Sequence, residues 1–155
     1  MSLQSKLPDV GTTIFTIMSR LAAEHNAINL SQGFPDFDAD PSLILAVSEA
    51  MAKGQNQYAP MPGLPDLNVA IARKLHGDYG WMPDPETEIT VTAGGTQALY
   101  SIIGAMISQG DEVIVLEPSY DSYIPSVVSF GGVVKTVQLL PPSYKVNWDE
   151  VESLI

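Results

Sequence analysis

The stretch EVIVLEPSYDSYIPSVVSFGGVVKTVQLL, residues 112–140, decides the fold class of this chain. Its first apolar run, 112–117, predicts a strand, and the segment 119–130 predicts a helix. Two glycines then separate this helix from a second predicted strand at 133–140. Because a strand, a helix and a strand in this order form the crossover between parallel strands, we expect an α/β fold.

The segment ITVTAGGTQALYSII, residues 89–103, extends this pattern toward the N-terminus. It predicts a strand over 89–92 and a helix over 95–108, with Gly94 and Gly95 at the junction. Such a junction directs backbone N–H groups and the positive end of the helix dipole toward one point. The turn can therefore hold a phosphate without Lys or Arg. The alternative is a tight turn whose glycines serve only backbone conformation and packing.

A second candidate feature is EPSYDSY, residues 117–123, which follows the strand predicted at 112–117. We expect it at the same carboxyl edge of the sheet as the glycine turn, where α/β proteins bind their ligands. Tyr120 and Tyr123 each offer a ring face to a flat heteroaromatic ligand. For Tyr123 the alternative, an aromatic side chain on the surface of the following helix, is favoured.

The rest of the chain predicts helices joined by loops that are rich in Gly and Pro. Helices are expected over 13–25, 40–54 and 64–79, a short strand over 27–30, and loops at SQGFPDFDADP and QNQYAPMPG. Asp40 is the expected cap of the second helix, with Pro41 at its first position. A last helix starts after Asn147, and no strand follows it. We therefore expect the chain to be the N-terminal part of a larger protein.

Composition excludes several classes of function. The net charge is −11 with only seven Lys and Arg, which argues against binding to nucleic acid or to anionic membrane surfaces. The chain has no Cys, and its two His lie far apart, so no metal site is expected. No apolar stretch is long enough to span a bilayer. The sequence begins without the apolar segment of a signal peptide, and we expect a cytoplasmic protein.

Four motifs in this order, INLSQGFPDF, NQYAPMPG, TVTAGGTQALY and GDEVIVLEPSYDSY, resemble the class I pyridoxal-phosphate-dependent aminotransferases. Within that family the likeness is to the kynurenine-aminotransferase-like branch, including the bacterial methionine aminotransferases. It implies fold type I, the aspartate-aminotransferase-like fold, with a mostly parallel sheet flanked by helices. It also implies an N-terminal arm and part of a small domain over 1–45, and an incomplete large cofactor-binding domain over 46–155.

The resemblance implies a set of site residues. Those that match the family's cofactor site are Gly94, Gly95, Thr96, Gln97, Tyr120 and Tyr58, and those that match its substrate site are Gly33 and Phe15. The turn 94–97 would hold the phosphate of pyridoxal phosphate, and Tyr120 would stack on its pyridine ring. Tyr58 would reach the phosphate bound by a partner subunit, which implies a homodimer with composite sites. Gly33 would meet the substrate carboxylate, and Phe15 would lie near the substrate side chain.

One part of the family's site has no counterpart in this sequence. None of the five lysines lies in the Ser-x-x-Lys-like setting of the Schiff-base lysine, which is therefore expected beyond Ile155. No residue of the chain is assigned a catalytic role, and this piece alone is expected to be inactive. The whole protein is expected to convert an amino acid to its 2-oxo acid, with a second 2-oxo acid as acceptor.

The preferred amino donor follows from an expected apolar wall. Ile14, Phe15 and the loop GFPDF, residues 33–37, offer no cation for an acidic side chain, so methionine and aromatic amino acids are favoured. Two alternatives remain open. One is pyridoxal-phosphate-dependent β-elimination of the cysteine-conjugate lyase type, and the other is a non-catalytic module for phosphate binding or dimerisation.

Overall fold

The computed structural model describes residues 4–33 and 35–155, which divide into two compact units. The helical unit is Met18–Thr92, and the sheet unit combines the N-terminal residues up to Ile17 with Ala93–Ile155. One boundary between the units falls inside the first helix, α1 (Ile14–Glu24). The domain division expected at residues 45 and 46 stays a prediction.

The helical unit contains most of α1 and the helices α2 (Pro41–Ala52) and α3 (Pro65–Tyr79), as the sequence predicts. The carboxylate of Asp40 accepts a hydrogen bond from the Ser42 N–H at 2.8 Å, and Pro41 occupies the first turn of α2. The predicted cap of this helix is therefore confirmed. Gly80, with φ +73°, ends α3 in the left-handed conformation that favours glycine.

Two short strands expected in this unit, 27–30 and 89–92, are wrong. The Asn29 amide donates to the Ser19 hydroxyl at 3.0 Å, so polar side chains fix this segment in place of a strand ladder. The Val91 N–H donates to the Pro62 carbonyl, in a loop, at 2.9 Å. A strand needs a neighbour with which to form a ladder, and neither segment has one among the described residues.

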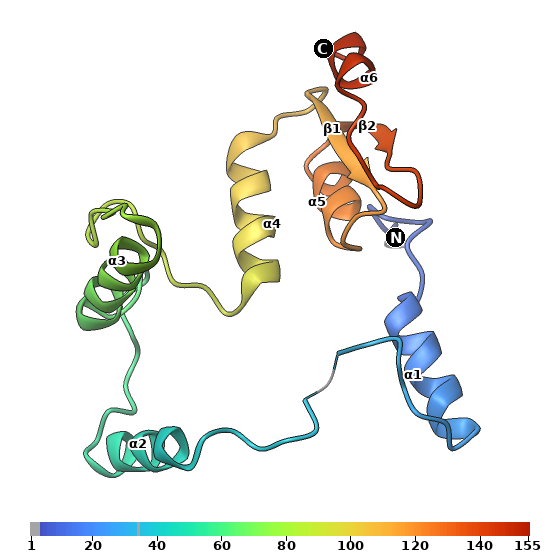
Figure 1. Cartoon of the computed structure of the whole chain (residues 1–155). Coiled ribbons are helices and arrows are strands. Elements are labelled where there is room, and N and C mark those ends of the chain that lie inside the picture. The colour runs from blue at the N-terminus through green and yellow to red at the C-terminus, as the bar shows by residue number, and fades with distance from the viewer. Residues whose placement is uncertain (1–3, 34) are drawn as a thin grey trace. The chain divides into compact units, whose positions relative to one another are not determined.

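The sheet unit is built around a strand–helix–strand crossover (Figure 1). Its elements are α4 (Gly95–Met106), β1 (Glu112–Glu117), α5 (Tyr123–Ser129), β2 (Val133–Gln138) and α6 (Trp148–Ser153). The strands β1 and β2 pair in parallel, with Glu112 opposite Val133 and Glu117 opposite Gln138. The predicted α/β class is thus confirmed. Pro125 lies in the first turn of α5, where its missing N–H does no harm.

The core of the sheet unit lies between α5 and the two strands. Val115 of β1, Val127 of α5 and Val137 of β2 are its buried hydrophobic residues among those described. Helix α4 packs against the end of α5, where the rings of Tyr100 and Phe130 lie 4.9 Å apart. A side chain at Gly104 would collide with the Phe130 ring, so this glycine allows the close approach that fixes α4 against α5.

Candidate cofactor site

The two glycines at the start of α4 differ in what the structure requires of them. Gly94 has φ +99° and ψ 165°, a conformation that residues with a side chain rarely adopt. Gly95 is the first residue of the helix, and a Cβ built on it would have no atom of the described residues within 4 Å, apart from its chain neighbours and the backbone of its own helix. Backbone conformation therefore explains Gly94. Neither conformation nor packing in the sheet unit explains Gly95.

The side chain of Gln97 fixes this turn from inside the helix. Gln97 is the third residue of α4, and its Oε1 accepts a hydrogen bond from the Ala93 N–H at 2.6 Å. This contact resembles the capping box, in which a residue in the first turn reaches back to the chain before the helix. Gly95 and Thr96 occupy the first two positions, whose N–H groups have no acceptor within a helix. The start of α4 is thus held by the Gln97 side chain, whereas its N-cap residue, Gly94, offers no capping side chain.

A pair of tyrosine rings follows β1. Tyr120 is 48% exposed, and its ring centroid lies 5.9 Å from that of Tyr123 with the planes at 63°, an edge-to-face contact. The Tyr123 N–H also donates to the Tyr120 carbonyl at 3.1 Å. A tight turn therefore brings the two rings together while part of the Tyr120 ring stays open to solvent.

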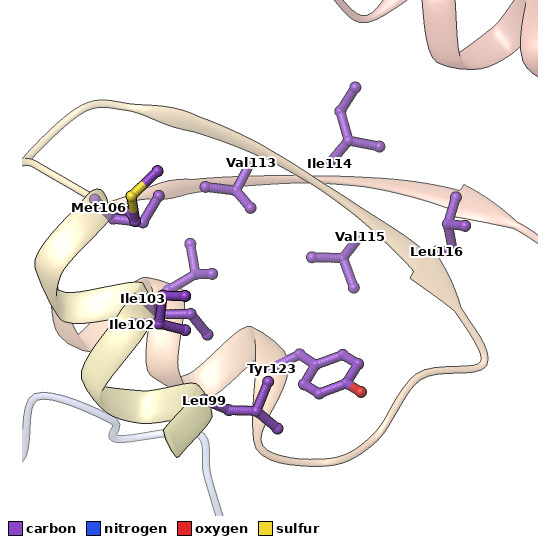
Figure 2. A pocket seen from close by; sticks show the side chains of 11 residues that line it. Leu99, Ile102, Ile103, Met106, Val113, Ile114, Val115, Leu116 and Tyr123 are labelled. Atoms are coloured by element: carbon purple, nitrogen blue, oxygen red, sulfur yellow. The ribbon is translucent and has the colours of Figure 1, made fainter. Parts of the chain in front are cut away.

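An apolar cavity of about 390 Å³ lies between α4, β1 and α5, and Figure 2 shows the side chains that line it. Leu99, Ile103 and Met106 line it from α4, Val113 and Val115 from β1, and Tyr123 from α5. The only polar side-chain group among its lining residues is the Tyr123 hydroxyl, so the cavity offers a phosphate no anchor. It matters for the site because Tyr123 and Leu99 both line it, and Leu99 lies one helical turn after Gly95.

The other predicted site residues are distributed over both units. Tyr58, fully exposed, and Gly33, where a Cβ would meet nothing within 4 Å, belong to the helical unit. Phe15 is half-buried on α1, in the part of that helix that belongs to the sheet unit. Phe34, a member of the expected apolar wall, lies outside the described residues. The structure joins residues 94–97 in one turn and places Tyr120 against Tyr123.

Charged side chains contribute little around the glycine turn. The ion pairs among the described residues are Arg20–Glu24, Lys53–Glu49, Lys74–Asp78 and Lys135–Glu112, and none involves residues 93–97 or 119–123. The part of the chain that the structure describes contains no cluster of His, Asp or Glu able to hold a metal ion. None of the helices described is both long and apolar enough to cross a bilayer. Within the turn 94–97 itself, the groups that could meet an anion are the backbone N–H groups and the Thr96 hydroxyl.

Two pKa shifts stand out in the helical unit. The Ser42 hydroxyl, and then the Ser42 N–H, donate to Asp40 and lower the pKa of its carboxyl group. The Glu86 N–H, and then the Thr87 side chain, do the same for the pKa of Asp84. Both carboxylates belong to local turns and caps, so these shifts mark structural contacts.

Two neighbours of Tyr120, Ser122 and Tyr123, have features in the structure that the sequence did not predict. The Oγ of Ser122 is buried and has no hydrogen-bond partner among the described residues. Tyr123 touches the Tyr120 ring and lines the apolar cavity. A usable signal was the spacing of the tyrosines in SYDSY, because residues three apart lie on one side of a helical turn.

The family model for aminotransferase class I and II matches residues 25–155 of this chain. The chain belongs to this family. The resemblance to the class I aminotransferases is thereby confirmed. The chain is 54% identical over 152 residues to methionine aminotransferase from Escherichia coli strain K12, covering 98% of this chain and 39% of that protein.

Solved structures agree with this assignment. An E. coli structure described with a methionine aminotransferase function matches with a TM-score of 0.95 and 53% identity, over 100% of this chain and 41% of that one. An aspartate aminotransferase from Thermus thermophilus matches with a TM-score of 0.85 and 34% identity, over 100% and 42%. The predicted aspartate-aminotransferase-like fold is confirmed. The chain spans about two fifths of the length of these relatives.

Proposed function

We propose that the protein to which this chain belongs transfers an amino group from an amino acid to a 2-oxo acid, with pyridoxal phosphate as its cofactor. Methionine and aromatic amino acids are the preferred donors. The observation that carries the proposal is the start of α4, where Gly95 occupies the first helical position and neither its conformation nor packing against the described residues of the sheet unit accounts for a glycine. Because the chain belongs to a family of aminotransferases, the ligand we propose for this opening is the phosphate group of pyridoxal phosphate.

The glycine turn suits the phosphate of this cofactor. The N–H groups of Gly95 and Thr96 would donate to the phosphate oxygens, and the positive end of the α4 dipole would favour their charge. Gln97 would keep the turn in shape through its bond to the Ala93 N–H. A missing side chain at Gly95 lets the phosphate approach the backbone closely. No Lys or Arg is needed for this part of the site.

Tyr120 suits the pyridine ring. Its own ring is 48% exposed and contacts the Tyr123 ring edge to face, so part of the Tyr120 ring remains available for stacking. When bound, the cofactor supplies an electron sink for the carbanion that forms at the substrate Cα. The role of this chain is to hold and orient the cofactor. With its phosphate anchored and its ring stacked on Tyr120, the cofactor would keep one alignment toward the substrate.

The remaining roles concern the substrate and a partner subunit. The backbone of Gly33, with open space around it, would receive the substrate carboxylate, and Phe15 would contact the substrate side chain. Tyr58 is fully exposed, which suits a residue that reaches the cofactor phosphate of a second copy in a homodimer. We further propose that this homodimer acts in the cytoplasm.

A panel of amino donors at a fixed 2-oxo acid tests the proposed reaction. We expect kcat/KM for methionine and phenylalanine to exceed that for aspartate about tenfold or more, because an apolar wall offers an acidic side chain no cation. Aspartate as the best donor would overturn the donor assignment. Release of pyruvate and ammonia from cysteine conjugates, without amino transfer, would favour β-elimination.

A complementation experiment tests the shared sites. In a homodimer with composite sites, Tyr58→Phe and Gly95→Ala damage the same site from different subunits. Mixed dimers then contain one site with both changes and one site with neither. After verified subunit exchange, the mixture should be more active than either variant alone. If activity stays at the mean of the two variants, each subunit builds its own site.

A further inference from the structure

Tyr123 contacts the Tyr120 ring and also lines the apolar cavity. Its edge-to-face contact with Tyr120, at 5.9 Å between centroids, is one of two ring pairs found among the described residues. Edge-to-face geometry is directional, because the positive edge of one ring meets the negative face of the other. Tyr123 can therefore restrict the orientation of the Tyr120 ring, as well as fill space beside it.

The same side chain faces α4 across the apolar cavity. Tyr123 and Leu99 line this cavity together, and Figure 2 shows the two side chains at the same end of it. Leu99 lies one helical turn after Gly95, so its position is tied to that of the glycine turn. Tyr123 itself is the first residue of α5, whose Val127 is 2% exposed and anchors that helix in the core.

We propose that Tyr123 is a positioning residue, which holds the ring of Tyr120 at a fixed orientation relative to the start of α4. The inference rests on the proposed function, in which Tyr120 stacks on the pyridine ring and the start of α4 holds the phosphate. A rigid ligand is bound best when the groups that meet its two ends are already in place. Tyr120 lies in an exposed loop before α5, and without the Tyr123 contact its side chain would lose the directional restraint that the neighbouring ring provides.

The test is a double-mutant cycle on cofactor binding by the whole protein. The variants are Tyr120→Leu, Tyr123→Leu and the double variant, with Tyr123→Phe to restore the ring and Tyr79→Leu, at an exposed tyrosine of α3, as the matched control. The readouts are the dissociation constant of pyridoxal phosphate from the apoprotein and the circular dichroism that the protein induces in the bound cofactor. Thermal unfolding of each apoprotein checks that the variants fold.

Tyr120→Leu should raise the dissociation constant about fivefold, the equivalent of the ~1 kcal/mol of one aromatic pair. Tyr123→Leu should raise it about two- to threefold and reduce the induced circular dichroism, whereas Tyr123→Phe and Tyr79→Leu should change neither. Because Tyr123 acts through Tyr120, the double variant should bind no more weakly than Tyr120→Leu alone. If Tyr123→Leu does not fold, the milder Tyr123→Met takes its place in the cycle.

Independent effects that multiply in the double variant would overturn the positioning role and leave the proposed function standing. So would a Tyr123→Phe variant that behaves like Tyr123→Leu, since the hydroxyl would then be the important group. A wild-type protein that does not bind pyridoxal phosphate would overturn the proposed function and, with it, this inference.

Discussion

Two Gly-Gly pairs lie in the sheet unit, and they use their second glycine differently. Gly94 and Gly131 come first in their pairs and have φ +99° and +82°, so the backbone requires both. A Cβ on Gly132 would lie 2.7 Å from Val127 Cγ1 and 2.9 Å from Ile107 Cγ2. A Cβ on Gly95 would meet no described atom within 4 Å. Close packing thus explains why the second residue of the pair 131–132 is a glycine. It does not explain the glycine at position 95, where no neighbouring side chain lies close enough to exclude a methyl group.

The difference separates a structural turn from a candidate binding turn within one small unit. The turn after α5 is closed by its own side chains, and its glycines let the chain pass close to the core. The turn before α4 is left open, although an alanine at the first helical position would be more favourable for the helix. We infer that a ligand occupies the open space at Gly95, and variants of the two glycine pairs test this inference.

Gly132→Ala should have the largest effect on stability. Its methyl group would overlap with Val127 and Ile107, and overpacking of this kind costs about 1–3 kcal/mol of unfolding free energy. Chemical denaturation of the whole protein measures this loss. Cofactor affinity of the folded protein should stay at the wild-type value. A stable Gly132→Ala variant would remove the contrast between the two pairs.

Gly94→Ala should reduce both stability and cofactor affinity. An alanine forced to φ +99° costs about 1–2 kcal/mol, and relief of that strain would move the turn that holds Gly95. Denaturation and equilibrium dialysis with pyridoxal phosphate report the two effects. Loss of stability with unchanged affinity would show that the shape of this turn does not matter for binding.

Gln97 separates the shape of the turn from its charge. Gln97→Leu removes the acceptor of the Ala93 N–H and should cost about 1 kcal/mol of unfolding free energy. Gln97→Glu keeps an acceptor at the positive end of α4 and should retain stability, but its charge should repel a phosphate and weaken cofactor binding. Equal cofactor affinity in Gln97→Glu and wild type would argue against a phosphate at this turn.

The start of α2 offers a small but specific contrast with the start of α4. The hydrogen bonds from Ser42 lower the pKa of Asp40 in the folded protein below its unfolded value of about 3.8. The ionised carboxylate therefore contributes its full stabilisation of α2 when the pH is above that unfolded value. That contribution is lost as the pH falls through the lower, folded value. Asp40→Ala should therefore reduce stability slightly at neutral pH and make little difference in strong acid. Cofactor affinity near neutral pH should not change, since this helix start is already occupied by its own carboxylate.

The sequence predicts the sheet unit better than the loops around it. Apolar runs gave β1 over its full length, because Val113 to Leu116 is a continuous apolar stretch of the kind found in parallel strands. Caps identified the start of α2, since Asp40 and Pro41 act locally. The strand predicted at 89–92 was wrong, because a strand needs a neighbouring strand to pair with, and the local sequence pattern does not show whether one is present. The Tyr120–Tyr123 contact is local, and the spacing of the two tyrosines was a signal for it, but the predicted helix began at 119 whereas α5 begins at Tyr123.

The most direct test of the account is Gly95→Ala, compared with Gly132→Ala in the same protein. Thermal unfolding of the apoprotein and the dissociation constant of pyridoxal phosphate are measured for both. We predict that Gly95→Ala keeps or slightly raises stability, by about 0.4–1 kcal/mol, because alanine favours the helix and meets no neighbour. The same variant should bind the cofactor at least about tenfold more weakly, since its methyl group stands where the phosphate would approach the backbone, whereas Gly132→Ala should show the opposite pattern. A Gly95→Ala protein that binds pyridoxal phosphate as tightly as wild type, or that loses as much stability as Gly132→Ala, would contradict the account.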